Sequence, residues 1–214
     1  MEVSKWTGII LAGGQSSRMG TNKALLELNG SSVLTHIAEA IRPAVSRIIV
    51  SAGPNEAIYS LMGDERFECI QDDYPGKGPL AGLHAALKAS STDWNLVSAC
   101  DMPLLQTSFF DGLKKLTEQY PTSSAIVPCV EGRIHPLAGV YHRRILPELE
   151  QCLIHERLRV TRWLEQIGCR YVETAELEQA GVLRPELQLS NMNTPEEFEH
   201  VRLRLHGSGG SPSA

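Results

Sequence analysis

The stretch Gly8–Gly30, GIILAGGQSSRMGTNKALLELNG, joins a short apolar run to a glycine-rich polar loop. Four consecutive apolar residues predict a buried strand, and Gly13 and Gly14 at its end allow the backbone to approach a ligand closely. Arg18 and Lys23 add positive charge in forms that suit phosphate. The stretch therefore predicts the first strand of an α/β fold, followed by a loop that binds phosphate.

Two well-known phosphate-binding motifs do not fit this loop. A P-loop requires G-x-x-x-x-G-K-[ST], but here Gly20 is followed by Thr21, Asn22 and only then Lys23. The dinucleotide fingerprint G-x-G-x-x-G also has a different glycine spacing. From these residues alone, a plain glycine-rich turn with two surface cations remains an alternative.

Strands and helices are predicted to alternate over the first 130 residues. This order is typical of βαβ units, which build a parallel sheet covered by helices on both faces. The apolar runs predict strands at 8–12, 47–53, 67–71, 94–100 and 124–130, and the helical spacing predicts helices at 33–45, 78–89 and 108–120.

The order is less regular after this point. We expect a strand at 135–142 that runs antiparallel at an edge of the sheet, a helical stretch at 145–167 with a break near 155–158, and a strand at 169–175. Thr194, Pro195 and Glu197 predict the start of a last helix. We expect one domain over residues 1–206 and a disordered Gly/Ser-rich tail at 207–214.

Composition excludes several classes of protein. The chain has 214 residues and a net charge of −5, which argues against nucleic-acid binding. Its densest basic stretch, Arg157–Arg162, fits the solvated side of a helix. No apolar run approaches the length of a membrane span. The five cysteines are odd in number and form no C-x-x-C pair, which favours a reduced, cytoplasmic setting over a zinc site or a disulfide framework.

Several polar residues follow predicted strands, where ligands of open α/β sheets gather. Asp101 ends one such strand and is a candidate ligand for Mg²⁺, although it could also cap the following turn. Asp72 ends another, with Asp73 beside it. Asn191 and Asn193 are two residues apart, so we expect their side chains on one face of an extended segment.

These residues carry a resemblance to a known family. LAGGQSSRMGTNK resembles the signature L-A-G-G-x-S-x-R-M-G-x-x-K of nucleotidyltransferases with a nucleotide-diphospho-sugar transferase fold, and more closely that of the molybdenum cofactor guanylyltransferase (MobA) family. The similarity continues through YPGKGPLAGL, CDMP, HPLAGVY and NMNTPEEF, and so covers nearly the whole chain. It implies a three-layer α/β/α sandwich, with a Rossmann-like, mostly parallel sheet and an antiparallel edge.

The resemblance also implies an activity. Members transfer GMP from GTP to the terminal phosphate of molybdopterin and release pyrophosphate with Mg²⁺, and proteins that handle the molybdenum cofactor are possible partners. The implied catalytic residues are Arg18, Lys23 and Asp101, and Asp101 is the implied metal ligand. The implied nucleotide contacts are Leu11, Ala12, Gly13, Gly14, Lys23, Asp72, Gly78, Pro79 and Asp101, and the implied acceptor contacts are Arg133, His135, Asn191 and Asn193.

Other functions stay open at this point. Cytidylyltransferases acting on the same pterin tend to have A-A-G where this chain has Ala12-Gly13-Gly14. Sugar-phosphate nucleotidyltransferases are usually longer, and a non-catalytic nucleotide or pterin carrier would not need Lys23 and Asp101. Ser51 stands where some members have Asn. Asp72 is preferred over Asp73 as the nucleotide contact. The family segment has more residues between this acid and the Tyr-Pro pair, so this chain has a gap there.

Overall fold

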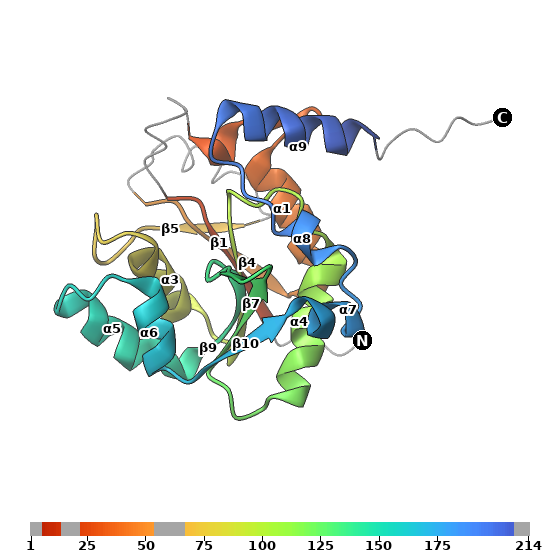
Figure 1. Ribbon diagram of the computed structural model, residues 1–214. Helices are drawn as coiled ribbons and strands as arrows, with labels where there is room; N and C mark the ends of the chain where they lie inside the picture. Colours follow the sequence, from red (N-terminus) through yellow and green to blue (C-terminus); the bar gives the residue numbers. More distant parts are fainter. Residues whose placement is uncertain (1–5, 14–21, 54–66, 208–214) are drawn as a thin grey trace.

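The computed structural model describes residues 6–13, 22–53 and 67–207, which form an α/β sandwich around one large sheet (Figure 1). The strands are β1 (Trp6–Leu11), β2 (Glu27–Leu28), β3 (Ser31–Ser32), β4 (Arg47–Ser51), β5 (Glu68–Ile70), β6 (Trp94–Ala99), β7 (Ala125–Val130), β8 (Arg133–Ile134), β9 (Ala138–His142) and β10 (Cys169–Glu173). The α-helices are α1 (Val33–Ile41), α3 (Pro79–Ala89), α4 (Thr107–Gln119), α5 (Leu146–Ile154), α6 (Val160–Gln166), α7 (Thr174–Gln179), α8 (Pro185–Gln188) and α9 (Pro195–Gly207).

The large sheet has the strand order β10-β7-β9-β6-β1-β4-β5, with β8 paired to β7. Strand β1 lies between β4 and β6 and is parallel to both. Strand β4 is parallel to β5, and β7 is parallel to β10. Because β9 is antiparallel to both β6 and β7, these two groups of strands also run in the same direction, and their carboxyl ends lie along one edge of the sheet. This is the edge at which open α/β sheets bind their ligands.

Helices cover both faces of the sheet (Figure 1). Helix α3 packs on β1 and β4 and contacts α5, whereas α4 packs on β7 and β9 and contacts α1 and α7. Between these layers the aliphatic side chains of the central strands are fully buried. Burial of each such side chain contributes about 1.5–3 kcal/mol to stability. The central strand residues that are completely shielded include Ile9, Ile10, Ile49, Val50, Leu96 and Val97.

Helix α1 shows how local sequence produces these elements. The hydroxyl of Ser32 caps the helix by accepting a hydrogen bond from the Thr35 N–H at 3.1 Å. The helix ends at Ile41, earlier than the expected residue 45, because Pro43 has no N–H to continue the ladder and lies in a short 3-10 turn. The buried positions recur at helical spacing: Val33, Leu34, Ile37, Ala38 and Ile41.

The antiparallel strand lies inside the sheet, and the expectation of an edge position was wrong. Strand β9 pairs antiparallel with β6 on one side and with β7 on the other. Its residues suit an interior strand: Ala138, Val140 and Tyr141 are fully buried. The Tyr141 ring stacks on Trp163 with centroids 5.9 Å apart, and its hydroxyl donates to the Pro136 carbonyl. Strand β9 thus joins β7 and β10 to the rest of the sheet.

The expected helix break and the last helix are both confirmed. The stretch 145–167 forms α5 and α6, separated by residues 155–159, and Glu156 there has a left-handed φ of 55°. At the start of α9, the Thr194 hydroxyl accepts from the Glu197 N–H at 3.2 Å, which is the predicted capping contact. Within the described ranges, no helix has the length and apolarity needed to cross a membrane.

Candidate active site

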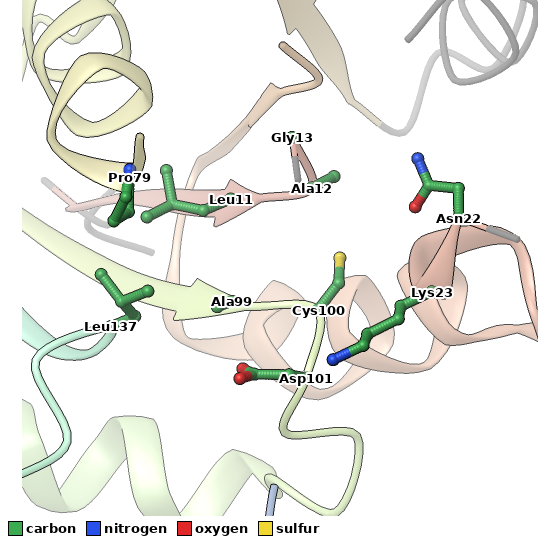
Figure 2. A pocket seen from close by; sticks show the side chains of 10 residues that line it. All are labelled: Leu11, Ala12, Gly13, Asn22, Lys23, Pro79, Ala99, Cys100, Asp101 and Leu137. Atoms are coloured by element: carbon green, nitrogen blue, oxygen red, sulfur yellow. The ribbon is translucent and has the colours of Figure 1, made fainter. Parts of the chain in front are cut away.

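The ends of the neighbouring strands β1 and β6 and the residues that follow them line a cavity at the carboxyl edge of the sheet. The register places Leu11 of β1 beside Ser51 of β4 and Ala99 of β6, so these strands end at the same level. The cavity has a volume of about 240 Å³, and Pro79 at the start of α3 lines it (Figure 2). Its lining residues are Leu11, Ala12, Gly13, Asn22, Lys23, Pro79, Ala99, Cys100, Asp101 and Leu137.

One wall of the cavity is formed where the loops after β1 and β4 touch. The Ala12 and Gly13 N–H groups both donate to the Ser51 carbonyl, at 2.8 and 3.0 Å. A Cβ on Gly13 would lie 2.8 Å from the Gly53 nitrogen, so Gly13 permits a close approach of two backbone segments. These two N–H groups already donate within the protein, so a ligand would contact other atoms of this wall.

Lys23 enters the cavity from the opposite side (Figure 2). It begins a short 3-10 helix, Lys23–Leu25, which Asn22 caps by accepting from the Ala24 N–H at 2.9 Å. The half-buried Lys23 ammonium donates to Asn193 Oδ1 at 2.6 Å. The chain therefore holds this cation in place from a segment 170 residues away.

Asp101 follows β6 and is held by the same C-terminal segment. Its carboxylate Oδ2 accepts from Asn191 Nδ2 at 3.2 Å, and its carbonyl accepts from the Met192 N–H at 2.7 Å. Burial raises the pKa of Asp101, while the charges of Lys23 and Arg133 oppose that rise. Both asparagines therefore reach the site from one extended segment, as their spacing predicts.

Two buried oxygens at this point suit a hard divalent cation. Asp101 Oδ1 and Asn191 Oδ1 are shielded from solvent, and neither has a hydrogen-bond partner within residues 6–13, 22–53 and 67–207. The same ranges hold no cluster of three or more His, Cys, Asp or Glu side chains that could bind a metal. A single carboxylate is enough for Mg²⁺, which usually keeps several waters. The donor set at Asp101 therefore fits this ion.

Asp72 and Asp73 point to different places. The Ser51 hydroxyl donates to Asp72 Oδ1 at 2.8 Å, beside the loop that follows β4. Burial raises the pKa of Asp72, and the Ser51 hydrogen bond opposes the rise. Asp73 instead accepts from Lys88 at 2.8 Å and lies 3.7 Å from His84, both on α3. The contact with Ser51 places Asp72 nearer to the ends of β1 and β4.

The start of α3 is shaped by Gly78, which has a left-handed φ of 70°. Pro79 follows at the first helical position and lines the cavity directly. One turn later, a Cβ on Gly82 would lie 2.5 Å from the Ser51 hydroxyl oxygen. Gly82 therefore makes room for the side chain that holds Asp72.

Arg133 and His135 lie around the β8 hairpin, and the ten residues that line the cavity do not include them. Arg133 is exposed, but its charge acts on Asp101. His135 is buried, and burial, aided by the Arg133 charge, lowers the pKa of its imidazole to about 4. His135 is therefore neutral at pH 7.

Two expected site residues, Gly14 and Arg18, lie outside the described residues. Four residues that line the cavity were not predicted from the sequence: Asn22, Ala99, Cys100 and Leu137. Ala99 and Cys100 adjoin Asp101, and Asn22 adjoins Lys23, so these three could have been found as neighbours of candidates. Leu137 could not, because its place depends on the interior position of β9.

Comparisons with known proteins agree on the family of this chain. The family model for the MobA-like NTP transferase domain matches residues 8–173. A probable molybdenum cofactor guanylyltransferase of Carboxydothermus hydrogenoformans is 34% identical over 91% of this chain and 94% of its own length. The molybdenum cofactor guanylyltransferase of Photobacterium profundum is 34% identical over 92% and 95%.

A solved structure has the same fold. The molybdopterin-guanine dinucleotide biosynthesis protein A of Archaeoglobus fulgidus superposes with a TM-score of 0.80 at 23% identity. The match covers 94% of this chain and 99% of that one. The two chains therefore share their fold over almost their whole lengths.

Proposed function

Because the chain belongs to the MobA-like NTP transferase family, we propose that it transfers GMP from GTP to the terminal phosphate of molybdopterin and releases pyrophosphate. One observation carries the proposal: Lys23, Asp101, Asn191 and Asn193 meet beside a cavity at the carboxyl edge of the sheet. The names of the relatives, which are guanylyltransferases, support GTP as the donor.

The reaction joins two anions that repel each other, and positive charge in the site reduces this repulsion. An oxygen of the acceptor phosphate attacks the α-phosphorus of GTP and forms a new P–O bond. The bond to the β-phosphate breaks, and its electron pair leaves with pyrophosphate. Such reactions depend mainly on alignment and charge stabilisation and need little from a protein base. Lys23 supplies a cation whose position is fixed by Asn193.

Asp101 is the residue that would hold Mg²⁺. When bound, the ion supplies positive charge to the phosphate oxygens. The chain prepares this place by keeping Asp101 Oδ1 buried and unpartnered, with Asn191 fixing the other carboxylate oxygen at 3.2 Å. Burial raises the pKa of Asp101, and a bound cation would stabilise its charged form.

The nucleoside and the acceptor would take different walls. Leu11, Ala12, Gly13 and Pro79 offer backbone and apolar surface for guanosine, with Asp72 nearby. On the other side, Asn191 and the positively charged Arg133 would face the acceptor phosphate. His135, being neutral, would contribute there as a hydrogen-bonding group rather than as a charge. We assign the reaction to the cytoplasm, where GTP is available.

The first experiment is calorimetric titration of the purified protein with GTP and with CTP, each with Mg²⁺. We expect GTP to bind more tightly, and pyrophosphate release on addition of molybdopterin would then establish the transfer. Preference for CTP would assign the chain to cytidylyl transfer and contradict the proposal. GTP binding without pyrophosphate release in the presence of molybdopterin would indicate a nucleotide or pterin carrier.

A further inference from the structure

The first turn of α9 is tied to the segment that precedes it by one carboxylate. Glu197 Oε2 accepts hydrogen bonds from the Asn193 N–H at 2.5 Å and from the Thr194 N–H at 3.1 Å. In return, the Thr194 hydroxyl accepts from the Glu197 N–H at 3.2 Å. An ordinary capping box satisfies one N–H with this side chain, whereas here the same oxygen also fixes the residue before the cap.

That extra residue is the one that holds the lysine of the site. Asn193 uses its backbone N–H for Glu197 and its side-chain oxygen for the Lys23 ammonium, at 2.6 Å. Within the part of the chain that the structure describes, Lys23 Nζ donates its hydrogen bond to Asn193. An ammonium has three donors, so this arrangement fixes the direction of one and leaves two for phosphate oxygens.

We propose that Glu197 is a positioning residue for Lys23 and that it acts through Asn193. This inference rests on the proposed function, in which Lys23 stabilises the phosphates. A short amide side chain is aimed by its own backbone, so fixing the Asn193 N–H fixes where its oxygen can meet Lys23. Displacement of a catalytic group by about 1 Å can cost about 100-fold in rate, which gives such a clamp a direct effect on turnover.

A double-mutant cycle separates this role from helix stabilisation. We expect Glu197→Ala to lower kcat about tenfold or more while KM for GTP changes less than about threefold. Asn193→Ala should lower kcat to a similar extent, and the double variant should be no slower than Asn193→Ala within about twofold. Multiplicative effects of the two changes would overturn the proposal.

Two further variants serve as controls. Glu196→Ala removes the neighbouring first-turn charge, which is exposed, and we expect it to leave kcat unchanged. Glu197→Gln removes the charge but keeps an oxygen that can accept both N–H groups, and it should recover most of the activity that Glu197→Ala loses. A loss in Glu196→Ala equal to that in Glu197→Ala would show that only the charge of the helix end matters.

A measurement without substrates keeps this inference separate from the proposed function. The rate at which an acetylating reagent labels Lys23, read by mass spectrometry, reports whether the ammonium is held. We expect Glu197→Ala to raise that rate several-fold in the otherwise unchanged chain and to have no effect in Asn193→Ala. An unchanged labelling rate in Glu197→Ala would overturn the clamp, even if the chain proved to transfer GMP.

Discussion

At the scale of single residues, each of the two charged groups of the site is held by a neutral amide. Lys23 and Asp101 line the same cavity, yet Lys23 is bonded to Asn193 and Asp101 to Asn191. Each charged group thus has a neutral amide partner that orients it without neutralising it. A direct ion pair would have to be broken before phosphate and metal could bind, whereas these amide contacts leave the charges available.

Lys23→Ala should remove the cation without disturbing the fold. We expect a fall in kcat of about 100- to 1,000-fold, as found when a single transition-state donor is deleted. The thermal midpoint should change little, because Lys23 is half-buried at the cavity wall. Stopped-flow or coupled measurement of pyrophosphate release checks the rate. Lys23→Arg is the matched control for charge, and an unaffected rate in Lys23→Ala would remove this residue from the mechanism.

Asp101→Asn should separate function from stability. Burial raises the pKa of Asp101, which means that its charged form is disfavoured in the fold, so the neutral side chain should raise the thermal midpoint in metal-free buffer. Activity should fall at least about 100-fold, together with any stabilisation by Mg²⁺. Scanning calorimetry with and without Mg²⁺ tests both points. Continued Mg²⁺ stabilisation of the variant would show that Asp101 is not the metal ligand.

At the scale of elements, the site depends on how closely α3 approaches the sheet. Gly82 lies directly against the side chain of Ser51 in β4, and Gly13 lies against the backbone of Gly53, so neither glycine could carry a side chain without a shift of its neighbour. The Ser51 hydroxyl therefore lies between Gly82 of α3 and Asp72, and it donates its hydrogen bond to Asp72. Small residues in α3 thus determine where an acidic side chain of another loop points.

Gly82→Ala tests this packing. The added Cβ would lie 2.5 Å from the Ser51 hydroxyl oxygen, so the hydroxyl must move and its bond to Asp72 must weaken. We expect a loss of about 1–3 kcal/mol in unfolding free energy, typical of overpacking, and a higher KM for GTP. Urea denaturation measures the first effect. If the cause is this clash, the loss should be smaller when Ser51→Ala is already present.

At the scale of the whole molecule, the fold buries two histidines, and burial favours their neutral form over the protonated form. Burial is the main cause that lowers the pKa of His135, to about 4, and it also lowers that of His84. Both side chains are nearly inaccessible to solvent. An unfolded histidine binds a proton near pH 6.5, so the unfolded state binds more protons than the folded state below that value.

The sign of the resulting pH dependence follows directly. The His135 contribution is fully present above pH 6.5 and is lost as pH falls towards about 4. Asp101 and Asp72 act in the opposite direction because burial raises the pKa of each. We expect His135→Gln to lose less unfolding free energy than the unchanged chain between pH 7 and pH 5, as measured by urea denaturation. An identical loss in both proteins would contradict the assignment.

Much of the fold was predictable because its signals are local. Apolar runs located the strands, and Thr194 and Glu197 marked the start of α9. Lys23 and Asp101 were predictable in the same way, since each belongs to a short motif beside a strand or loop. Their partners were identified only as candidates, because nothing in the sequence states that Asn193 reaches Lys23 rather than Asp101.

Other features depend on three-dimensional register, which the sequence does not display. The interior place of β9 follows from pairing with both β6 and β7, and hydrophobic pattern alone does not separate an interior strand from an edge. Leu137 joined the cavity for the same reason. The hydrogen bonds from the Ala12 and Gly13 N–H groups to the Ser51 carbonyl were likewise visible only in the structure, and they leave two fewer donors in the stretch that the sequence predicts to bind phosphate.

The interior position of β9 also bears on how the chain is made. Strand β6 leaves the ribosome about forty residues before β9, and in the finished sheet β7 and β10 are joined to β6 only through β9. Asn191 and Asn193 emerge later still, so Lys23 and Asp101 lack their amide partners until residue 193 has left the ribosome. The long sequence separation of these contacts favours slow folding. A truncated nascent chain would therefore expose an unpaired strand and an unassembled site, which makes it a natural client for chaperones and proteases rather than a partly active enzyme.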